Sequence, residues 1–265
     1  MQKLIIFIIL FCGLLTSAIY SQGLRNHQNE AFKKGEKLKY RVYYDSFLTG
    51  QLTAGEATIH ITEEDKKFNN RSTYHIIGKG RSKGAFNWFY NVNDRFESYV
   101  DEDAFVPYLF IRRTREGGYI KDDDVYFDHE KRIATSRTAV KNVPENIQDF
   151  VSALFFARTL DISSVEIGST FNIDFFLDDS VYVSAIKYLG KEIVETELGK
   201  FNCLKFAPMM ATGNVFADKY PMFVWVTDDK NHLPVFAEAA VIVGSVKMEL
   251  IKCSGLKNPM TSRIE

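Results

Sequence analysis

Ser82 is the residue whose surroundings come closest to a catalytic motif. It lies at the centre of Gly80-Arg81-Ser82-Lys83-Gly84, which matches the G-x-S-x-G pattern of serine hydrolases. In such an enzyme Ser82 would be the nucleophile, with Asp128 and His232 available later in the chain as its partners. The pattern works where a parallel strand turns sharply into a helix. Here an alternating run at 73–77 precedes it and extended residues follow, so the sequence favours a turn between strands, and we predict no catalytic residues.

The histidines and cysteines form no recognisable metal-binding pattern. None of the five histidines has His-x-x-x-His or Glu-x-x-His spacing, and there is no C-x-x-C motif. We therefore predict neither a metal ion nor a cofactor. Cys203 and Cys253 both fall in strand-like segments, so a disulfide between them and two buried free thiols are both open. The histidines are His27, His60, His75, His129 and His232.

A run of acidic residues follows a run of arginines. Asp122-Asp123-Asp124 comes shortly after Arg112-Arg113-Thr114-Arg115, with Gly117-Gly118 between them. A calcium loop of the EF-hand type needs acids at alternate positions and a closing glutamate, and this run has neither. We predict instead a hairpin whose arginines and aspartates form ion pairs across the two strands.

Apolar side chains at two places are our candidates for lining a ligand site. Phe86, Trp88 and Phe89 crowd together after a glycine-containing turn, and contiguous aromatic residues in an extended segment face both sides of a sheet. Some must then contact a second apolar object, which is either a helix or a ligand. The predicted helix described below adds the other three candidates. These are Phe150, Leu154 and Phe155. Packing in a core is the alternative for all six.

The composition is that of a globular protein with no net electrostatic preference. Of the 265 residues 46% are hydrophobic, and 33 basic residues face 34 acidic ones. Low-complexity disorder is excluded by the apolar fraction. The near neutrality predicts no footprint for nucleic acid and no polybasic patch for an anionic membrane surface.

The first 21 residues have the pattern of a secretory signal peptide. Lys3 is followed by about a dozen apolar residues and then by small ones up to Ser21. We predict cleavage there, no membrane span afterwards, and a periplasmic or secreted location. A retained helical anchor is the alternative, although the apolar core is short for a bilayer. Residues 22–265 then form a single β-rich domain.

Alternation with a period of two dominates the rest of the chain and predicts antiparallel strands. Leu38, Tyr40 and Val42 alternate with charged residues, and similar runs continue to the C-terminus. One segment, 147–160, has helical spacing, with Asn146 as its expected N-cap. We predict a mainly β protein in which a curved antiparallel sheet, a half-barrel or roll, packs around this one central helix. One alternative is that the strands on either side of it form two similar halves.

Several short motifs together resemble a known family. They are Phe32 to Tyr40, Thr53-Ala54-Gly55-Glu56-Ala57, Gln148 to Leu154, Gly199-Lys200-Phe201-Asn202-Cys203 and the run from Val224 to Val235. In order and spacing the chain resembles the bacterial cell-envelope family of domain of unknown function 3108 over about residues 32–252. The resemblance implies a secreted or periplasmic, mainly β protein of a Gram-negative envelope, and it supplies no activity or catalytic residues.

Three classes of function fit these observations. Our first hypothesis is a non-catalytic envelope protein whose sheet and helix enclose an apolar space for a lipid, an acyl chain or another apolar small molecule. The alternatives are a periplasmic serine hydrolase that uses Ser82 and a structural or assembly partner in the envelope. The sequence names neither a ligand nor a protein partner.

Overall fold

The computed structural model describes residues 23–47, 50–209, 220–241 and 244–264. The predicted signal peptide, 1–21, lies outside the described residues. Before the central helix come β1 (Lys37–Ser46), β2 (Gly50–Ile61), β3 (Lys67–Phe68), β4 (Arg71–Ser82), β5 (Asn93–Asp101), β6 (Pro107–Glu116), β7 (Tyr119–Asp128), β8 (Ile133–Thr135) and β9 (Val140–Asn142). After it come β10 (Thr170–Asn172), β11 (Phe175–Leu177), β12 (Ser180–Tyr182), β13 (Ala185–Thr196), β14 (Gly199–Pro208), β15 (Met222–Thr227), β16 (Pro234–Ala240), β17 (Ser245–Ser254) and β18 (Arg263–Ile264). The helices are α2 (Gly84–Phe89) and α3 (Phe150–Ala157).

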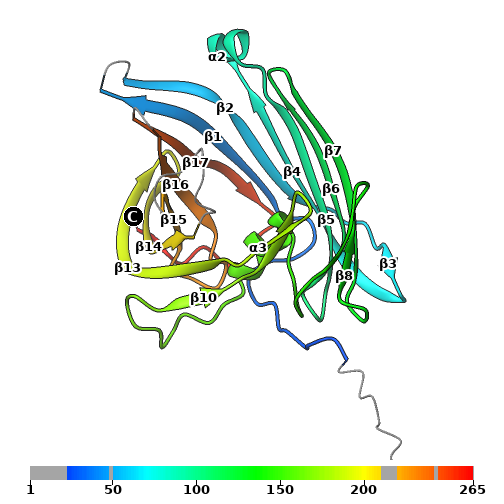
Figure 1. The fold of residues 1–265 in the computed structure, drawn as a ribbon. Helices are drawn as coiled ribbons and strands as arrows, with labels where there is room; N and C mark the ends of the chain where they lie inside the picture. The colour runs from blue at the N-terminus through cyan, green and yellow to red at the C-terminus, as the bar shows by residue number, and fades with distance from the viewer. Residues whose placement is uncertain (1–22, 48–49, 210–219, 242–243, 265) are drawn as a thin grey trace, which may run out of the picture.

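Most strands belong to one curved antiparallel sheet (Figure 1). Its order is β10-β13-β14-β15-β16-β17-β1-β2-β4-β5-β6-β7-β8-β9, with β18 beside β14 and β3 beside β4, while β11 and β12 form a separate pair. The last long strand, β17, pairs with the first, β1, and this ladder joins the N-terminal and C-terminal meanders. The edge strands β9 and β10 do not meet, so the sheet curls without closing into a barrel. The predicted fold class, a curved antiparallel sheet around a central helix, is confirmed.

Alternation along the strands separates the core from the outer face. Leu38 and Tyr40 on β1 are buried, whereas Lys37, the first residue of the strand, is exposed. The inward side chains form three apolar clusters, one beside α3 in the N-terminal half, one around the β17–β1 ladder and one in the C-terminal half. Each sheet segment therefore buries one face and leaves the other to solvent.

Helix α3 is shorter than the sequence predicted. Asp149, not Asn146, is its N-cap, because the Asp149 side chain accepts hydrogen bonds from the backbone N–H groups of Val151 and Ser152. Asn146 has a φ of +58°. The backbone of Gln148 forms a parallel bridge with Phe175 of β11, so Gln148 is paired with a strand and cannot join the helix.

The predicted arginine–aspartate hairpin is present as β6 and β7. Gly117 has a φ of +58° in its turn. Arg113 Nη1 lies 2.6 Å from Asp124 Oδ1, and Arg115 Nη1 lies 2.7 Å from Asp122 Oδ1. These pairs are cross-strand contacts on a partly exposed face, which agrees with the structural interpretation of the acidic run.

A buried ion pair fixes the end of α3. The Arg158 guanidinium contacts Glu36 through two hydrogen bonds of 2.6 and 3.0 Å, and the two side chains are 2% and 1% exposed. Arg158 also donates to the carbonyl oxygen of Asn231. The Asn231 side chain in turn donates to the backbone near the C-terminus. Arg158 thus links α3 to the start of β1 and to the β15–β16 loop, and the Asn231 side chain extends the link to the C-terminal segment.

Candidate functional site: an apolar cavity beside helix α3

Helix α3 has apolar residues on two faces. Val151 and Phe155 pack into the buried cluster of the N-terminal half. The residues at 150, 153, 154 and 157 share another face, at the spacing of a helical stripe, and this face lines a cavity. Phe150 is 50% and Leu154 37% exposed, because the cavity is open on one side. The helix therefore serves as a core element and as a cavity wall.

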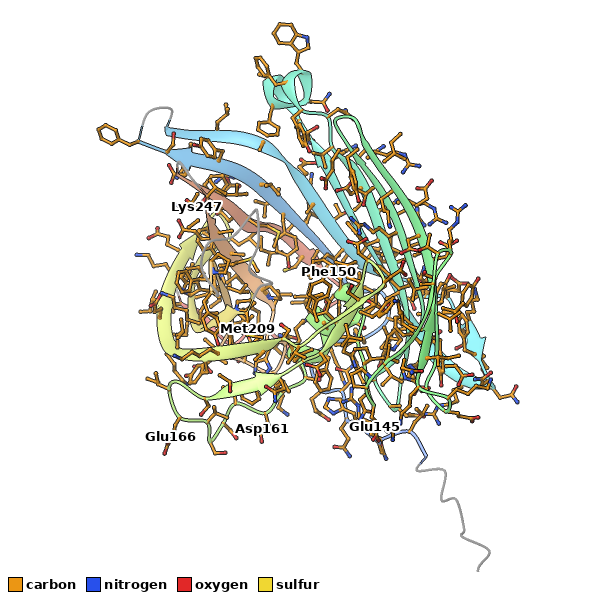
Figure 2. All side chains as sticks on the ribbon, in the orientation of Figure 1. Glu145, Phe150, Asp161, Glu166, Met209 and Lys247 are labelled. Carbon is orange, nitrogen blue, oxygen red and sulfur yellow. The ribbon has the colours of Figure 1, made fainter. Side chains whose placement is uncertain are left out.

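The cavity lies between α3 and the concave face of the C-terminal half-sheet. Its volume is about 370 Å³, within the range of roughly 300–1,000 Å³ typical of small-molecule sites. Figure 2 shows Phe150 and Met209 on opposite sides of the space between helix and sheet. The strands contribute a nearly continuous apolar wall. Its members are Ile186 of β13, Phe206 and Pro208 of β14, Met222, Val224 and Val226 of β15, and Pro234 of β16.

Three polar residues also line the cavity, and each has a defined partner. Ser184 Oγ donates to the carbonyl oxygen of Met209, 3.0 Å away. Arg158 is held by its ion pair. His232 Nδ1 lies 2.8 Å from the carbonyl oxygen of Arg158 and therefore donates to it. His232 Nε2 has no hydrogen-bond partner in the described part of the chain. An apolar cavity with a few fixed polar groups suits a ligand with a long apolar part and a small polar one.

The structure divides the six predicted lining residues among three places. Phe150 and Leu154 line the cavity. Phe155, 1% exposed, is in the core on the other side of α3. We expected Phe86, Trp88 and Phe89 in an extended segment. They lie instead on α2, at one end of the sheet (Figure 1).

The α2 aromatics are largely exposed and do not reach the cavity. Trp88 is 85% and Phe89 78% exposed. Residues 86–90, four of which are aromatic, form a helical turn in which the Tyr90 N–H donates to the carbonyl oxygen of Phe86, and that geometry removes them from the sheet.

Sequence reasoning missed the sheet side of the cavity. Met222, Val224 and Val226 alternate along β15 and point to one face. That alternation is visible in the sequence. The alternation predicts an apolar face, but it does not predict that α3 and this face are separated by a cavity.

Ser82 is not placed as the nucleophile of a triad. Its hydroxyl donates to Asn87 Oδ1 at 2.6 Å and accepts from the Val92 N–H at 2.9 Å. Asp128 lies at the end of β7 and pairs with Lys131. His232 lies at the cavity. The hydroxyl therefore fastens α2 to the start of β5, and the three residues are not brought together.

His75 and the two cysteines have structural surroundings. His75 lies between Glu64 and Glu97, with N–O distances of 2.7 and 2.8 Å. Among the described residues no group of three or more His, Cys, Asp or Glu side chains has the arrangement of a metal site. Cys203 and Cys253 are free thiols. Burial raises the pKa of the Cys203 thiol to about 12, so this thiol is not a nucleophile near neutral pH.

The fold and the cavity define an open, curled β-sheet protein with an apolar space beside its central helix. Residues 39–251 match the family described as "Protein of unknown function (DUF3108)", and the chain belongs to this family. Among curated proteins none matches the chain. Within the described residues, no helix is long and apolar enough to cross a bilayer.

Three solved structures match the chain over most of its length. A beta-barrel-like protein of domain of unknown function 1849 from Brucella abortus superimposes with a TM-score of 0.57 and 10% identity, over 85% of this chain and 99% of that one. A protein provisionally described as exported, with a YmcC-like fold, from Bacteroides fragilis has 10% identity, a TM-score of 0.37 and coverages of 87% and 99%. A provisional lipoprotein from Parabacteroides distasonis has 10% identity, a TM-score of 0.38 and coverages of 87% and 100%. Only the first similarity supports a conclusion, and that conclusion concerns the fold alone.

Proposed function

We propose that the protein is a non-catalytic binding protein of the cell envelope, periplasmic or secreted, which holds a lipid, an acyl chain or another apolar molecule in the cavity beside α3. The observation that carries the proposal is the cavity itself, whose walls are apolar on both the helix and the sheet side. The signal-peptide pattern of residues 1–21 supports the location. Two methionines that line the cavity, Met209 and Met222, supply side chains that adapt to ligands of different shape.

Native mass spectrometry of protein purified from the envelope tests the proposal. We expect adducts with the mass of a lipid or fatty acid, or binding of added fatty acid to a ligand-free fraction. Leu154→Trp places a larger side chain in the cavity and should abolish the adduct. Ile193→Trp is the matched control, because Ile193 is 66% exposed on β13 and does not line the cavity. A homogeneous apo mass with no uptake of fatty acid would refute the proposal.

The non-catalytic part of the proposal has its own test. If Ser82 were an activated nucleophile, an activated fluorophosphonate probe would label the protein, and Ser82→Ala would remove the label. The two hydrogen bonds that hold the Ser82 hydroxyl support the opposite expectation, which is no labelling of either protein.

A structural or assembly role is the second candidate, and the exposed aromatics of α2 favour it. Side chains such as Trp88 and Phe89 are typical of docking surfaces when they protrude together. A photo-crosslinking amino acid at position 88 should give one discrete adduct in cells under this hypothesis, and the same group at Lys187 on β13 should not. Equal crosslinking from both positions would speak against it.

A further inference from the structure

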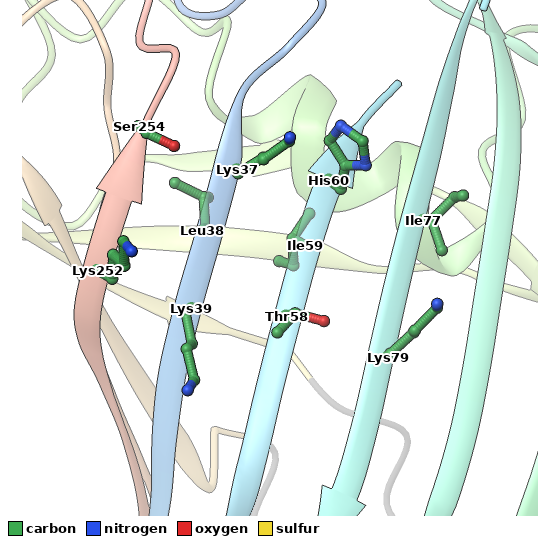
Figure 3. Close-up of a pocket in the computed structure, with 10 residues that line it drawn as sticks. All are labelled: Lys37, Leu38, Lys39, Thr58, Ile59, His60, Ile77, Lys79, Lys252 and Ser254. Carbon is green, nitrogen blue, oxygen red and sulfur yellow. The ribbon is translucent and has the colours of Figure 1, made fainter. Parts of the chain in front are cut away.

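A shallow groove with a basic lining crosses the outer face of the sheet, on the side away from α3. It has a volume of about 410 Å³ and runs over β17, β1, β2 and β4 (Figure 3). Because Leu38 and Tyr40 of β1 point into the core, the lysines that alternate with them point outward. The residues that line the groove, by side chain or by backbone, are Lys37, Leu38, Lys39, Thr58, Ile59, His60, Ile77, Lys79, Lys252 and Ser254.

The register places the basic residues in one cluster. Lys252 of β17 is directly opposite Lys39 of β1, and Lys39 is opposite Thr58 of β2. Thr58 is in turn opposite Lys79 of β4. With strands about 4.8 Å apart, the Cα atoms of Lys252 and Lys79 are separated by roughly 14 Å. Lys37 lies on the same face as Lys39, two residues earlier. Like charges directly opposite each other destabilise a sheet. This arrangement therefore lowers the stability of the sheet, and the packing of the core does not explain it.

Charge compensation is weaker here than on neighbouring parts of the same outer face. Arg41 pairs with Glu249 and Glu197, and the arginines of β6 pair with aspartates of β7. In the groove only Lys39 has a carboxylate partner, Glu56, at 3.1 Å, and Glu56 is shared with Lys83. Within the described residues Lys37, Lys79 and Lys252 have no ion pair, and no acidic side chain lines the groove.

The residues between the lysines add hydrogen-bonding groups. Thr58 and Ser254 present hydroxyls to the groove, and His60 lies between Lys37 and Ile77 across the strands. Burial, and then the charge of Lys37, lower the pKa of His60. His60 is therefore neutral near pH 7 and serves as a hydrogen-bonding group, not as a further cation.

We propose that this groove is an anion site that binds a ligand carrying two or more phosphate groups. Lysine ammonium groups are common phosphate ligands. Four of them spread over roughly 14 Å match several anionic groups on one ligand better than a single small anion. The groove and the cavity are on opposite faces of the sheet, so this site does not depend on the proposed function. The phosphate groups can belong to a soluble oligophosphate or to the headgroups of a lipid surface.

The test removes the three unpaired lysines together. The variant is K37Q/K79Q/K252Q, and the matched control is K67Q/K141Q/K187Q, which removes the same charge from β3, β9 and β13 outside the groove. Calorimetric titration with tripolyphosphate tests the soluble source. Co-sedimentation with phosphatidylglycerol vesicles, compared with phosphatidylcholine vesicles, tests the headgroup source.

We expect the wild-type protein and the control variant to bind at least one of the two probes, and binding to weaken as salt is added. At a lipid surface each lysine contributes about fivefold, so the groove variant should lose on the order of 100-fold in vesicle binding. Binding of tripolyphosphate alone identifies a soluble ligand, and binding of phosphatidylglycerol alone identifies a headgroup. Thermal unfolding shows that the groove variant folds, since removal of like charges should not destabilise it. Equal losses in the two variants, or no binding of either probe by the wild type, would overturn the proposal.

Discussion

The buried pair of Arg158 and Glu36 gives the sharpest prediction about stability. The side chains are 2% and 1% exposed and share two hydrogen bonds. Glu36→Leu leaves the Arg158 cation buried with only the carbonyl oxygen of Asn231 as a polar partner. Arg158→Met leaves the Glu36 carboxylate buried without its cation. Removing one member of such a pair costs about 3–5 kcal/mol of the free energy of unfolding.

The double variant, Glu36→Leu with Arg158→Met, has the opposite expectation. Replacing both charges with apolar groups is often neutral or stabilising, and here the remaining cost is the unpaired carbonyl of Asn231, about 1–3 kcal/mol. The double variant should therefore be more stable than either single variant. Phe32 and Phe155, whose rings lie 5.1 and 5.2 Å from the guanidinium carbon, would surround the new methionine.

Urea unfolding measures all three variants, with the fluorescence of Trp225, 7% exposed, as the signal from the core. For an m-value of about 3 kcal/mol/M, each single variant should lower the midpoint by roughly 1–2 M. A double variant that loses as much as the two single variants combined would show that the charges are not coupled. Fatty-acid binding by the double variant would show in addition that the pair does not itself bind the ligand.

Three further predictions concern single sites. Burial raises the pKa of Asp149 to about 6, above the value of about 3.9 in an unfolded chain. The unfolded chain then loses its proton first, so stability should fall by about 3 kcal/mol as the pH rises from about 4 to about 6. Asp149→Asn should remove that dependence, and identical pH profiles in urea unfolding would contradict it. Iodoacetamide labelling, mapped by mass spectrometry, should modify Cys203 only after unfolding, because the thiol is buried and its pKa is about 12. If Cys203 formed a disulfide with Cys253, it would stay unlabelled in the unfolded protein as well. Gly55→Ala should lower the thermal midpoint, since an added Cβ would clash with the backbone of β4, whereas Gly80→Ala meets nothing within 4 Å and is its control; equal midpoints would refute the clash.

Local sequence patterns predicted the strands well because each strand has one face in the core and one face in solvent. The alternation of Leu38 and Tyr40 with lysines requires a buried and an exposed face, whatever the strand pairs with. The arginine–aspartate hairpin was predictable for the same reason, since its two strands are neighbours in the sequence. The fold class follows from many such strands and a single helix.

Features that depend on distant partners were not predictable. The N-terminal limit of α3 is set by the pairing of Gln148 with Phe175, and nothing near 146–149 reveals it. The first turn of α2 is equally hidden, since six residues give too little periodicity. The cavity depends on how far α3 stands from β15, which is a property of packing and not of pattern.

The lysine groove shows why an overall charge balance misleads in a β-protein. The chain is nearly neutral, and from this we expected no polybasic patch. Lys39 and Lys252 are more than two hundred residues apart in the sequence, yet the β17–β1 ladder places them opposite each other. Net charge averages over the whole surface, whereas a binding site is determined by the few charges that the register brings together.

Strand β1 connects the two proposed sites. Because side chains alternate with a period of two, Leu38 and Tyr40 support the core while Lys37 and Lys39 form the groove on the other face. A shift of the β1 register by one residue would exchange the two sets, so the pairing of β1 with β17 and β2 maintains both faces at once. The faces are nevertheless chemically separate. Leu154→Trp should therefore leave phosphate binding unchanged, and K37Q/K79Q/K252Q should leave fatty-acid binding unchanged, so that failure of one proposal is distinguishable from failure of the other.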